Sequence, residues 1–245
     1  MSYKIVALFI VFLALPVAAK GLDANEQRMA DWIDAHAEEA IALLEETVNI
    51  SSGTMNRDGV RAVGRVMQRE LDALGLASEW IDMPEEMGRA GHLFGRKVDG
   101  SSKKFVLIGH LDTVFEAADG FEGFARDGDT ATGPGIDDMK SGNVVIVYAL
   151  KALRQIGALD DIPVVVAYTG DEEKTGRPLA VSRKELIDAG KWADFGLGFE
   201  GAVHYDDTDW STIARRSSSR WILTVEGKRA HSSGVFSDNV GAGAI

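Results

Sequence analysis

The sequence predicts an α/β fold, a mostly parallel sheet with flanking helices, on the strength of three observations. A continuous apolar run at 105–108 and a second apolar segment at 163–168 are typical of strands buried on both faces of a parallel sheet, and a third strand is predicted at 195–199. Apolar residues at helical spacing fill the intervening segments 139–156 and 182–189. This alternation of strands and helices requires crossover connections, which place helices on both faces of the sheet.

Further elements are expected on either side of this central part. Helices at 25–48 and 59–74 are predicted from apolar residues at helical spacing, and Gly75 is a typical helix stop. Short strands are predicted near 78–81 and 92–98. Towards the end of the chain we expect a polar surface loop or domain junction at 204–210, a strand at 220–225 and the start of a helix at 240–245.

Length, composition and net charge exclude some classes of function. The 245 residues are enough for one large domain, or for one domain plus the start of another. Hydrophobic residues make up 45% of the chain, and the net charge is −12 with no run of Lys or Arg. Because a nucleic-acid-binding protein needs a basic face, we expect no nucleic-acid partner.

The first 19 residues have the pattern of a secretory signal peptide. Lys4 precedes an apolar run at 5–17, and the small residues Ala18 and Ala19 follow it. The alternative, an uncleaved membrane anchor, requires roughly 20 apolar residues, and this run is shorter. We therefore expect cleavage after Ala19, a secreted or periplasmic location, and no stable membrane insertion of the mature protein.

The chain contains no cysteine. Export to an oxidising compartment is compatible with this, although no disulfide can then stabilise the fold. Thiolate ligands are also ruled out, so any metal site has to use His, Asp and Glu.

Potential metal ligands follow each of the three central strands. In open α/β sheets, ligands bind beyond the carboxyl ends of the strands. The side chains expected to converge there are His110 and Asp112 after the first strand, Asp138 at the start of the next helix, Glu172 and Glu173 after the second strand, and Glu200 after the third. Each of them alone is more often a structural histidine, a helix N-cap or a solvated carboxylate. Their joint occurrence at successive strand ends favours a metal site.

Local geometry supports this interpretation. His110 and Asp112 are two residues apart on an extended segment, so both side chains point to one side, where the carboxylate can fix the tautomer of a metal-bound imidazole. Glu172 and Glu173 point in different directions, so one can hold metal while the other faces a bound water. One or two divalent cations would offset the repulsion among so many carboxylates. The ligand types suit zinc, with cobalt and manganese as alternatives.

Four segments resemble motifs of the M20 peptidase family, particularly its glutamate carboxypeptidase-like group. They are Val48–Thr54, Gly109–Val114, Gly133–Lys140 and Asp171–Glu173, similar to the family's N-terminal segment and its three metal motifs. Together they span positions 48–173, which is more than half of the chain that follows the predicted signal peptide. Ser141 departs from the pattern, since many relatives have glycine at that place.

The resemblance implies a set of metal ligands. Asp138 would bridge two zinc ions, and His110 and Glu200 would hold one metal each. Glu173 would hold one of the two ions. The family's last ligand is a histidine in a later part of the catalytic domain, so we expect the 245 residues to lack one metal ligand.

The resemblance also implies catalytic roles. Asp112 would orient the metal-binding histidine, and Glu172 would act as the general base. The segment Gly227–Ser233 is similar to a motif of the family's lid domain, in which the residue at the place of His231 reaches the active site of a neighbouring subunit and stabilises the oxyanion. A homodimer formed through the lid is therefore expected.

The signal-peptide pattern and the family resemblance together divide the chain into three parts. They are a signal peptide at 1–19, the N-terminal part of a metal-binding catalytic domain at 20–216, and the start of a smaller α/β lid or dimerisation domain at 217–245. The family's substrate-carboxylate-binding Arg and Asn belong to the lid and are not found among these residues.

The predicted function is hydrolysis of an amide bond next to a free carboxylate, by a glutamate carboxypeptidase-like peptidase that acts on a small peptide or an N-acyl-amino acid. The alternative is an N-acyl-amino-acid deacylase, similar to aminoacylases and acetylornithine deacetylases, because the metal motifs are shared. A non-catalytic binding module is disfavoured by the presence of Asp138 and Glu172. A purely structural metal is disfavoured because a closed structural site needs no spare base.

Overall fold

The computed structural model describes residues 21–116, 118, 120–201, 203–213 and 221–224. These residues fall into two compact units that divide after Gly201, and each unit is described by itself. The predicted signal peptide, the helix start at 240–245, the domain boundary at 216–217 and His231 lie outside the described residues. No helix in the described part of the chain combines the length and the apolar composition needed to cross a membrane.

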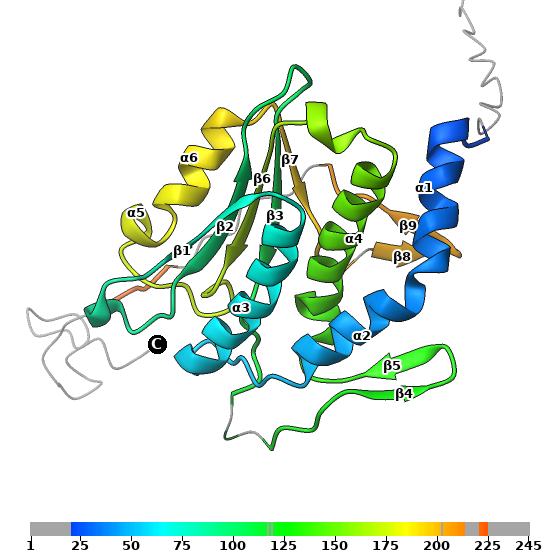
Figure 1. The fold of residues 1–245 in the computed structure, drawn as a ribbon. Coiled ribbons are helices and arrows are strands. Elements are labelled where there is room, and N and C mark those ends of the chain that lie inside the picture. The colour runs from blue at the N-terminus through cyan, green and yellow to red at the C-terminus, as the bar shows by residue number, and fades with distance from the viewer. Residues whose placement is uncertain (1–20, 117, 119, 202, 214–220, 225–245) are drawn as a thin grey trace, which may run out of the picture. The chain divides into compact units, whose positions relative to one another are not determined.

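A five-stranded mixed sheet with the order β1-β2-β6-β3-β7 forms the centre of the first unit (Figure 1). The strands are β1 Ala77–Ile81, β2 His92–Lys97, β3 Phe105–His110, β6 Val164–Thr169 and β7 Phe195–Gly198. Strands β6, β3 and β7 run parallel, whereas β1 and β2 are joined to them by antiparallel pairing. The predicted α/β fold is confirmed, and the three strands expected in the parallel part of the sheet are its three parallel strands.

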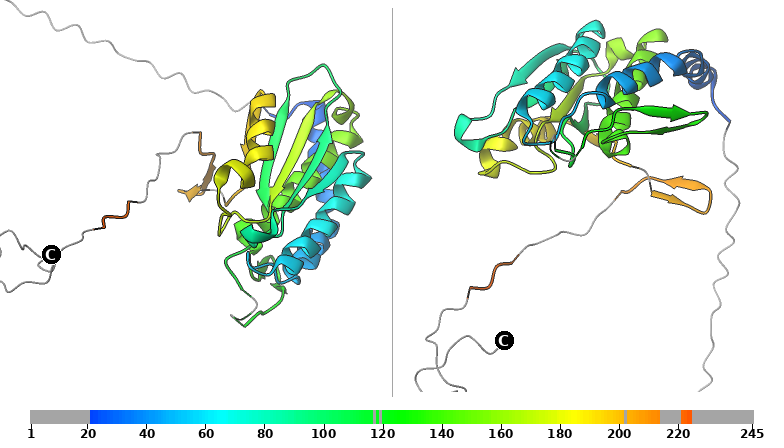
Figure 2. Two further views of the ribbon diagram at one scale, coloured as in Figure 1. Left: turned by 90° about the vertical axis from the view of Figure 1, so that its left-hand side faces the viewer. Right: turned by 90° about the horizontal axis from the view of Figure 1, so that it is seen from below.

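Helices cover both faces of this sheet (Figure 2). One face carries α1 Ala24–Ala35, α2 Ala37–Val48, α3 Arg57–Ala73 and α4 Ser141–Gln155, and the other carries α5 Leu179–Ser182 and α6 Lys184–Trp192. In β6, Val164 and Val166 belong to the core formed with α3 and α4, while Val165 and Ala167 pack with Ala189 of α6. This alternation buries every residue of β6.

The helix predicted at 25–48 is two helices, because the backbone breaks at His36. The amide of His36 bonds to the carbonyl of Ile33, and its imidazole Nδ1 lies 2.7 Å from the carbonyl oxygen of Trp32. The ring also stacks on Trp32 with centroids 4.0 Å apart. The side chain therefore takes the acceptor that a continuous helix would give to the backbone amide.

Other helix boundaries also shift. The helix predicted at 139–156 begins at Ser141, after the short turn η3 Ile136–Lys140, and the one predicted at 182–189 is divided at Arg183 into α5 and α6. Single-turn 3-10 helices occupy Glu85–Met87 and Leu159–Asp161.

Two hairpins are not predicted by the sequence. Ala125–Asp127 (β4) pairs with Thr130–Thr132 (β5) in the first unit. In the second unit, Val203–Tyr205 (β8) pairs with Thr208–Trp210 (β9), so the prediction of a loop at 204–210 is wrong. Its turn residues Asp206 and Asp207 have φ values of 53° and 52°, the left-handed backbone that a two-residue hairpin turn requires.

The strand predicted at 220–225 is not found in residues 221–224, which have no regular structure. Its two end residues lie outside the described part of the chain.

Candidate metal centre

The carboxyl ends of the three parallel strands bring the predicted ligands together. His110 ends β3, Glu172 and Glu173 follow β6, and Glu200 follows β7. Asp138 comes from η3, where its backbone is not helical, with φ −114° and ψ 94°. Four separate segments of the chain thus supply side chains to the same edge of the sheet, as ligand sites in open α/β sheets require.

His110 lies between two groups of carboxylates. Its Nε2 is 2.9 Å from Asp138 Oδ1 and 3.4 Å from Glu200 Oε1. One ligand atom from each of these three residues lies within 4.8 Å of the others, and the same holds for His110, Glu172 and Glu173. Glu200 therefore stands beside His110 around one position, whereas we expected the two residues to hold different metals.

One side of the site is buried and the other is open. The His110 side chain is 1% exposed, whereas Asp138 is 62% exposed and Glu200 50%. Glu173 Oε1 is buried and has no hydrogen-bond partner among the described residues. Because an unpartnered buried carboxylate oxygen is costly, this atom fits a cation ligand. One imidazole and several carboxylates form a donor set that suits zinc.

The electrostatics of the site favour added positive charge. Burial opposes the charged form of His110, but hydrogen bonds to Asp112 and Glu200 outweigh it and raise the pKa of His110 to about 11. Burial raises the pKa of Glu172 and of Glu173, and neighbouring carboxylates raise both further against the opposing effect of His110. A divalent cation would supply the positive charge in place of the proton on the imidazole.

Asp112 holds the histidine and the loop of the two glutamates. The Nδ1 of His110 lies 2.9 Å from the carbonyl oxygen of Asp112 and 3.5 Å from its Oδ1, which leaves Nε2 for the metal side. The carboxylate accepts hydrogen bonds from the amides of Glu172 and Glu173, at 3.0 and 3.1 Å. Burial raises the pKa of Asp112, but hydrogen bonds from His110 and Thr54 outweigh it and lower the pKa, so the carboxylate is ionised.

Thr54 and Asn143 support the site, and sequence reasoning gave neither a role. The Thr54 hydroxyl donates to Asp112 Oδ2 at 2.7 Å, because a parallel bridge sets Gly53 beside Thr113. Asn143 Nδ2 donates to the carbonyl oxygen of His110 at 2.6 Å. Thr54 lies within one of the quoted motifs, but its partner can be identified only in the folded chain.

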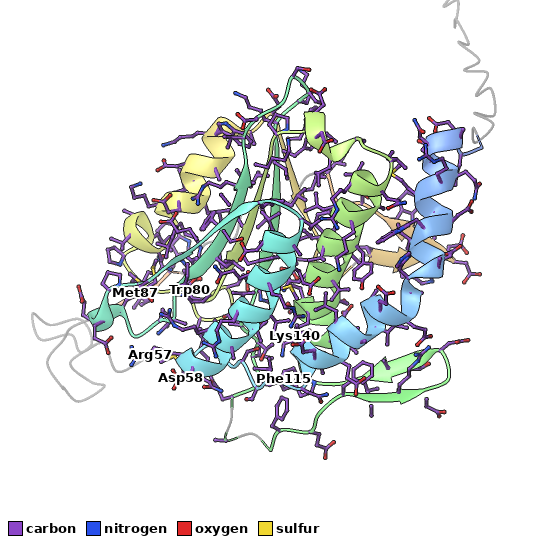
Figure 3. The ribbon with its side chains drawn as sticks, viewed as in Figure 1. Arg57, Asp58, Trp80, Met87, Phe115 and Lys140 are labelled. Atoms are coloured by element: carbon purple, nitrogen blue, oxygen red, sulfur yellow. The ribbon has the colours of Figure 1, made fainter. Side chains whose placement is uncertain are left out.

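Lys140 joins the start of α4 to the end of α2 (Figure 3). Its side chain is 1% exposed, and Nζ donates to the carbonyl oxygens of Thr47 and Ile50 at 3.0 and 2.9 Å. Burial lowers the pKa of Lys140 to about 8. The turn that carries Asp138 is therefore anchored to the N-terminal segment through a charge-assisted contact.

Gly142 allows the chain before Glu200 to approach α4. A Cβ at this position would lie 2.0 Å from the carbonyl oxygen of Phe199. The backbone of α4 thus packs directly against the residue that precedes Glu200, which brings its carboxylate to His110. The residue after Ser141 is the glycine that this close approach needs.

The fold and its donor set together define a candidate metal-binding domain, with one imidazole and three carboxylates at the ends of parallel strands and a fourth carboxylate, Asp138, on η3. Residues 106–217 match the peptidase family M20/M25/M40. The chain thus carries a domain of this peptidase family, and the family resemblance predicted from its motifs is confirmed.

Two curated proteins show the relationship in sequence. Carboxypeptidase G2 of Pseudomonas sp. (strain RS-16) is 34% identical over 163 residues, which make up 65% of this chain and 38% of that protein. Succinyl-diaminopimelate desuccinylase of Acidiphilium cryptum (strain JF-5) is 30% identical over 198 residues, 78% of this chain and 50% of that protein. The chain thus spans half the length of these relatives or less.

Solved structures show the same fold at lower identity. Human carnosine dipeptidase 1 has a TM-score of 0.59 and 20% identity, over 72% of this chain and 41% of that one. The M20 family metallo-carboxypeptidase Sso-CP2 from Sulfolobus solfataricus has a TM-score of 0.56 and 16% identity, over 67% of this chain and 38% of that one.

Proposed function

We propose that the protein is a di-zinc metallohydrolase that cleaves an amide bond next to a free carboxylate, as a glutamate carboxypeptidase-like peptidase. The observation that carries this proposal is the convergence of His110, Asp138, Glu200 and Glu173 beside Glu172, in two overlapping groups whose ligand atoms lie within 4.8 Å of one another. The 34% identity to carboxypeptidase G2 supports a substrate of the carboxypeptidase kind.

Bound zinc would act as a Lewis acid and lower the pKa of a bound water. His110, Asp138 and Glu200 would hold one ion. Glu173, whose buried Oε1 lacks a partner among the described residues, would share Asp138 with it for a second ion.

Glu172 is the proposed general base. It would take a proton from the attacking water and deliver it to the leaving nitrogen, and its raised pKa brings it nearer to the pH at which such transfers are efficient. Asp112 holds the backbone of this residue through the amide hydrogen bond described above. His231 of a neighbouring subunit is proposed to stabilise the oxyanion.

A second candidate is an N-acyl-amino-acid deacylase. The 30% identity to succinyl-diaminopimelate desuccinylase, over 78% of this chain, favours it. Both reactions hydrolyse an amide with the same residues, so the substrate alone separates the two.

Metal content and hydrolysis, measured together on the complete protein, test the proposal. We expect about two zinc ions per chain and chelator-sensitive cleavage of N-acyl-glutamates, dipeptides or N-acetyl-amino acids. Manganese or cobalt in their place would correct the choice of metal only. Glu172→Gln should keep the metal and lose activity by about 10²–10⁴-fold. The control Glu45→Gln, at an exposed position of α2, should behave as wild type. Near-normal activity of Glu172→Gln, or a protein that binds no metal, would contradict the proposal.

Export and assembly are proposed from the sequence patterns. N-terminal sequencing of the mature protein should begin at Lys20, in a secreted or periplasmic fraction, and an intact Met1 in the cytoplasm would contradict export. Light scattering of the complete protein should give a homodimer, and a monomer would contradict assembly through the lid.

A further inference from the structure

The loop that carries Glu172 and Glu173 is built from turns and bends, outside any helix or strand. It follows β6 and extends from Gly170 to Gly176. Asp112 holds it through the amides of the two glutamates. A second set of contacts, made by residues with no role in the proposed chemistry, holds the loop at both ends.

The first of these contacts is a buried ion pair between Asp171 and Arg183, which we call the Asp171–Arg183 clamp. Asp171 is fully buried, and its Oδ1 accepts from Arg183 Nη1 at 2.5 Å while its Oδ2 accepts from the Gly176 amide at 2.8 Å. Arg183 Nη2 donates to the Asp171 carbonyl and to the Thr175 hydroxyl, both at 3.2 Å. The Thr175 hydroxyl in turn donates to the carbonyl of Glu172 at 3.2 Å.

His92 and Ser182 brace the ends of the loop. His92 Nδ1 accepts from the Gly170 amide at 3.1 Å, and Nε2 donates to the Ser182 carbonyl at 2.8 Å. The Ser182 hydroxyl donates to the carbonyl of Gly176 at 2.9 Å. The first and last residues of the loop are therefore tied to the junction between α5 and α6, where Arg183 stands.

The chemistry of the clamp indicates positioning more than stability. Desolvation offsets most of the attraction in a buried ion pair, so an apolar pair of similar volume often stabilises a fold as well. A guanidinium adds fixed geometry, because its planar fork bonds the side chain and the backbone of Asp171 together. Since Asp171 directly precedes Glu172, any shift of its backbone moves the proposed base.

We propose that the Asp171–Arg183 clamp, braced by His92 and Ser182, is a positioning device that fixes the backbone of Glu172 and Glu173 at the metal centre. The inference rests on the proposed function for the roles of these two glutamates. It gives a positioning role to Arg183, a residue that contacts neither substrate nor metal in the proposed function.

The test compares Arg183→Met and Arg183→Lys in the complete protein, with Arg65→Met on the exposed face of α3 as the control. Backbone hydrogen exchange at Glu172 and Glu173, zinc affinity by chelator competition, and kcat and KM are measured for each. Arg183→Met should raise exchange at both amides by about tenfold or more and weaken zinc binding by about 10–100-fold. It should lower kcat by about 100-fold with KM changed less than about threefold.

Arg183→Lys should recover part of each loss, because an ammonium keeps the charge pair but not the fork. A clamp with a purely structural role would lower the thermal midpoint and leave the folded enzyme unchanged. Exchange, zinc affinity and kcat of folded Arg183→Met all within about threefold of wild type would overturn the proposal.

Thr175→Val provides the test if Arg183→Met does not fold. It removes only the hydroxyl that links Arg183 to the Glu172 carbonyl, and it should raise exchange at Glu172 and lower kcat several-fold. Wild-type values for both would overturn the proposal. A wild-type protein without metal or hydrolysis would refute the proposed function instead, while the exchange comparison would still decide whether the clamp fixes the loop.

Discussion

The carboxylate of Asp112 accepts a hydrogen bond from the backbone amide of Glu172 at 3.0 Å, although 60 positions separate the two residues in the chain. The sequence predicts only that Asp112 orients the metal-binding histidine. In the structure the same carboxylate also fixes the loop of the proposed base, so one side chain ties the loop after β6 to the segment that follows β3. Asp112 therefore connects the metal-binding histidine to the loop of the two glutamates.

Asp112→Asn should disturb both functions at once. Both carboxylate oxygens accept from donors, and an amide would turn an NH₂ group towards one of them. We expect zinc affinity or activity to fall by about 10–100-fold and unfolding free energy to drop by about 1–3 kcal/mol. Metal titration and urea denaturation measure these changes, with Asp72→Asn at an exposed position of α3 as the control. A variant with wild-type metal affinity and activity would show that Asp112 does not hold the site.

Gly142→Ala should displace Glu200. The added methyl would meet the backbone of Phe199 at 2.0 Å, and backbone can yield only by moving the end of β7. We expect a loss of about 1–3 kcal/mol in unfolding free energy, together with weaker metal binding. Gly198→Ala, on the same strand, is the matched control because its Cβ would have open space. Equal metal affinity in the two variants would show that the close approach at Gly142 does not position Glu200.

Lys140→Met should destabilise the protein by about 1–3 kcal/mol, because it leaves the carbonyls of Thr47 and Ile50 without their buried donor. The gain from removing a desolvated charge works in the other direction and is expected to be the smaller effect. Chemical denaturation measures the difference, with Lys103→Met on an exposed loop as the control. A variant more stable than wild type would show that the desolvation cost of the Lys140 ammonium exceeds the contribution of its two hydrogen bonds.

His92 should make stability fall in mild acid. Burial lowers its pKa, with Asp171 raising it and Arg183 lowering it again, so His92 stays neutral in the folded protein at pH values where the unfolded chain is protonated. The unfolded state therefore binds more protons as the pH falls below about 6.5, and stability declines there. His92→Gln should be less stable than wild type by about 1–3 kcal/mol at pH 8, and the gap should narrow as the pH falls.

Denaturation curves between pH 8 and pH 5 measure this effect, with His36→Gln, a half-buried histidine on the N-terminal helices, as the control. A constant gap between wild type and His92→Gln over that range would contradict the account of His92.

The sequence predicts the parallel strands and the ligand residues because both are local features. An apolar run signals a buried strand, and the residue that follows the strand lies at the carboxyl end of the sheet. The contacts that hold the ligands are not local. Thr54 reaches Asp112 across 58 positions, and nothing in the sequence marks that partner. Arg183 falls inside the helix predicted at 182–189, where an arginine is unremarkable until the chain breaks there and turns its side chain to Asp171.

The orientation of β1 and β2 is also hidden in the sequence, because a strand's direction depends on the partner it pairs with. The hairpin at 203–210 was missed for a different reason. Its strands are three residues each, and three of its polar residues are aspartates, which are rare in strands.

Anomalous diffraction at the zinc absorption edge, on crystals of the complete protein, tests the central claim most directly. The account predicts one peak within coordination distance of His110, Asp138 and Glu200, and a second beside Glu173 that shares Asp138. Peaks elsewhere in the molecule, or none at these side chains in a zinc-loaded protein, would contradict the proposed metal centre.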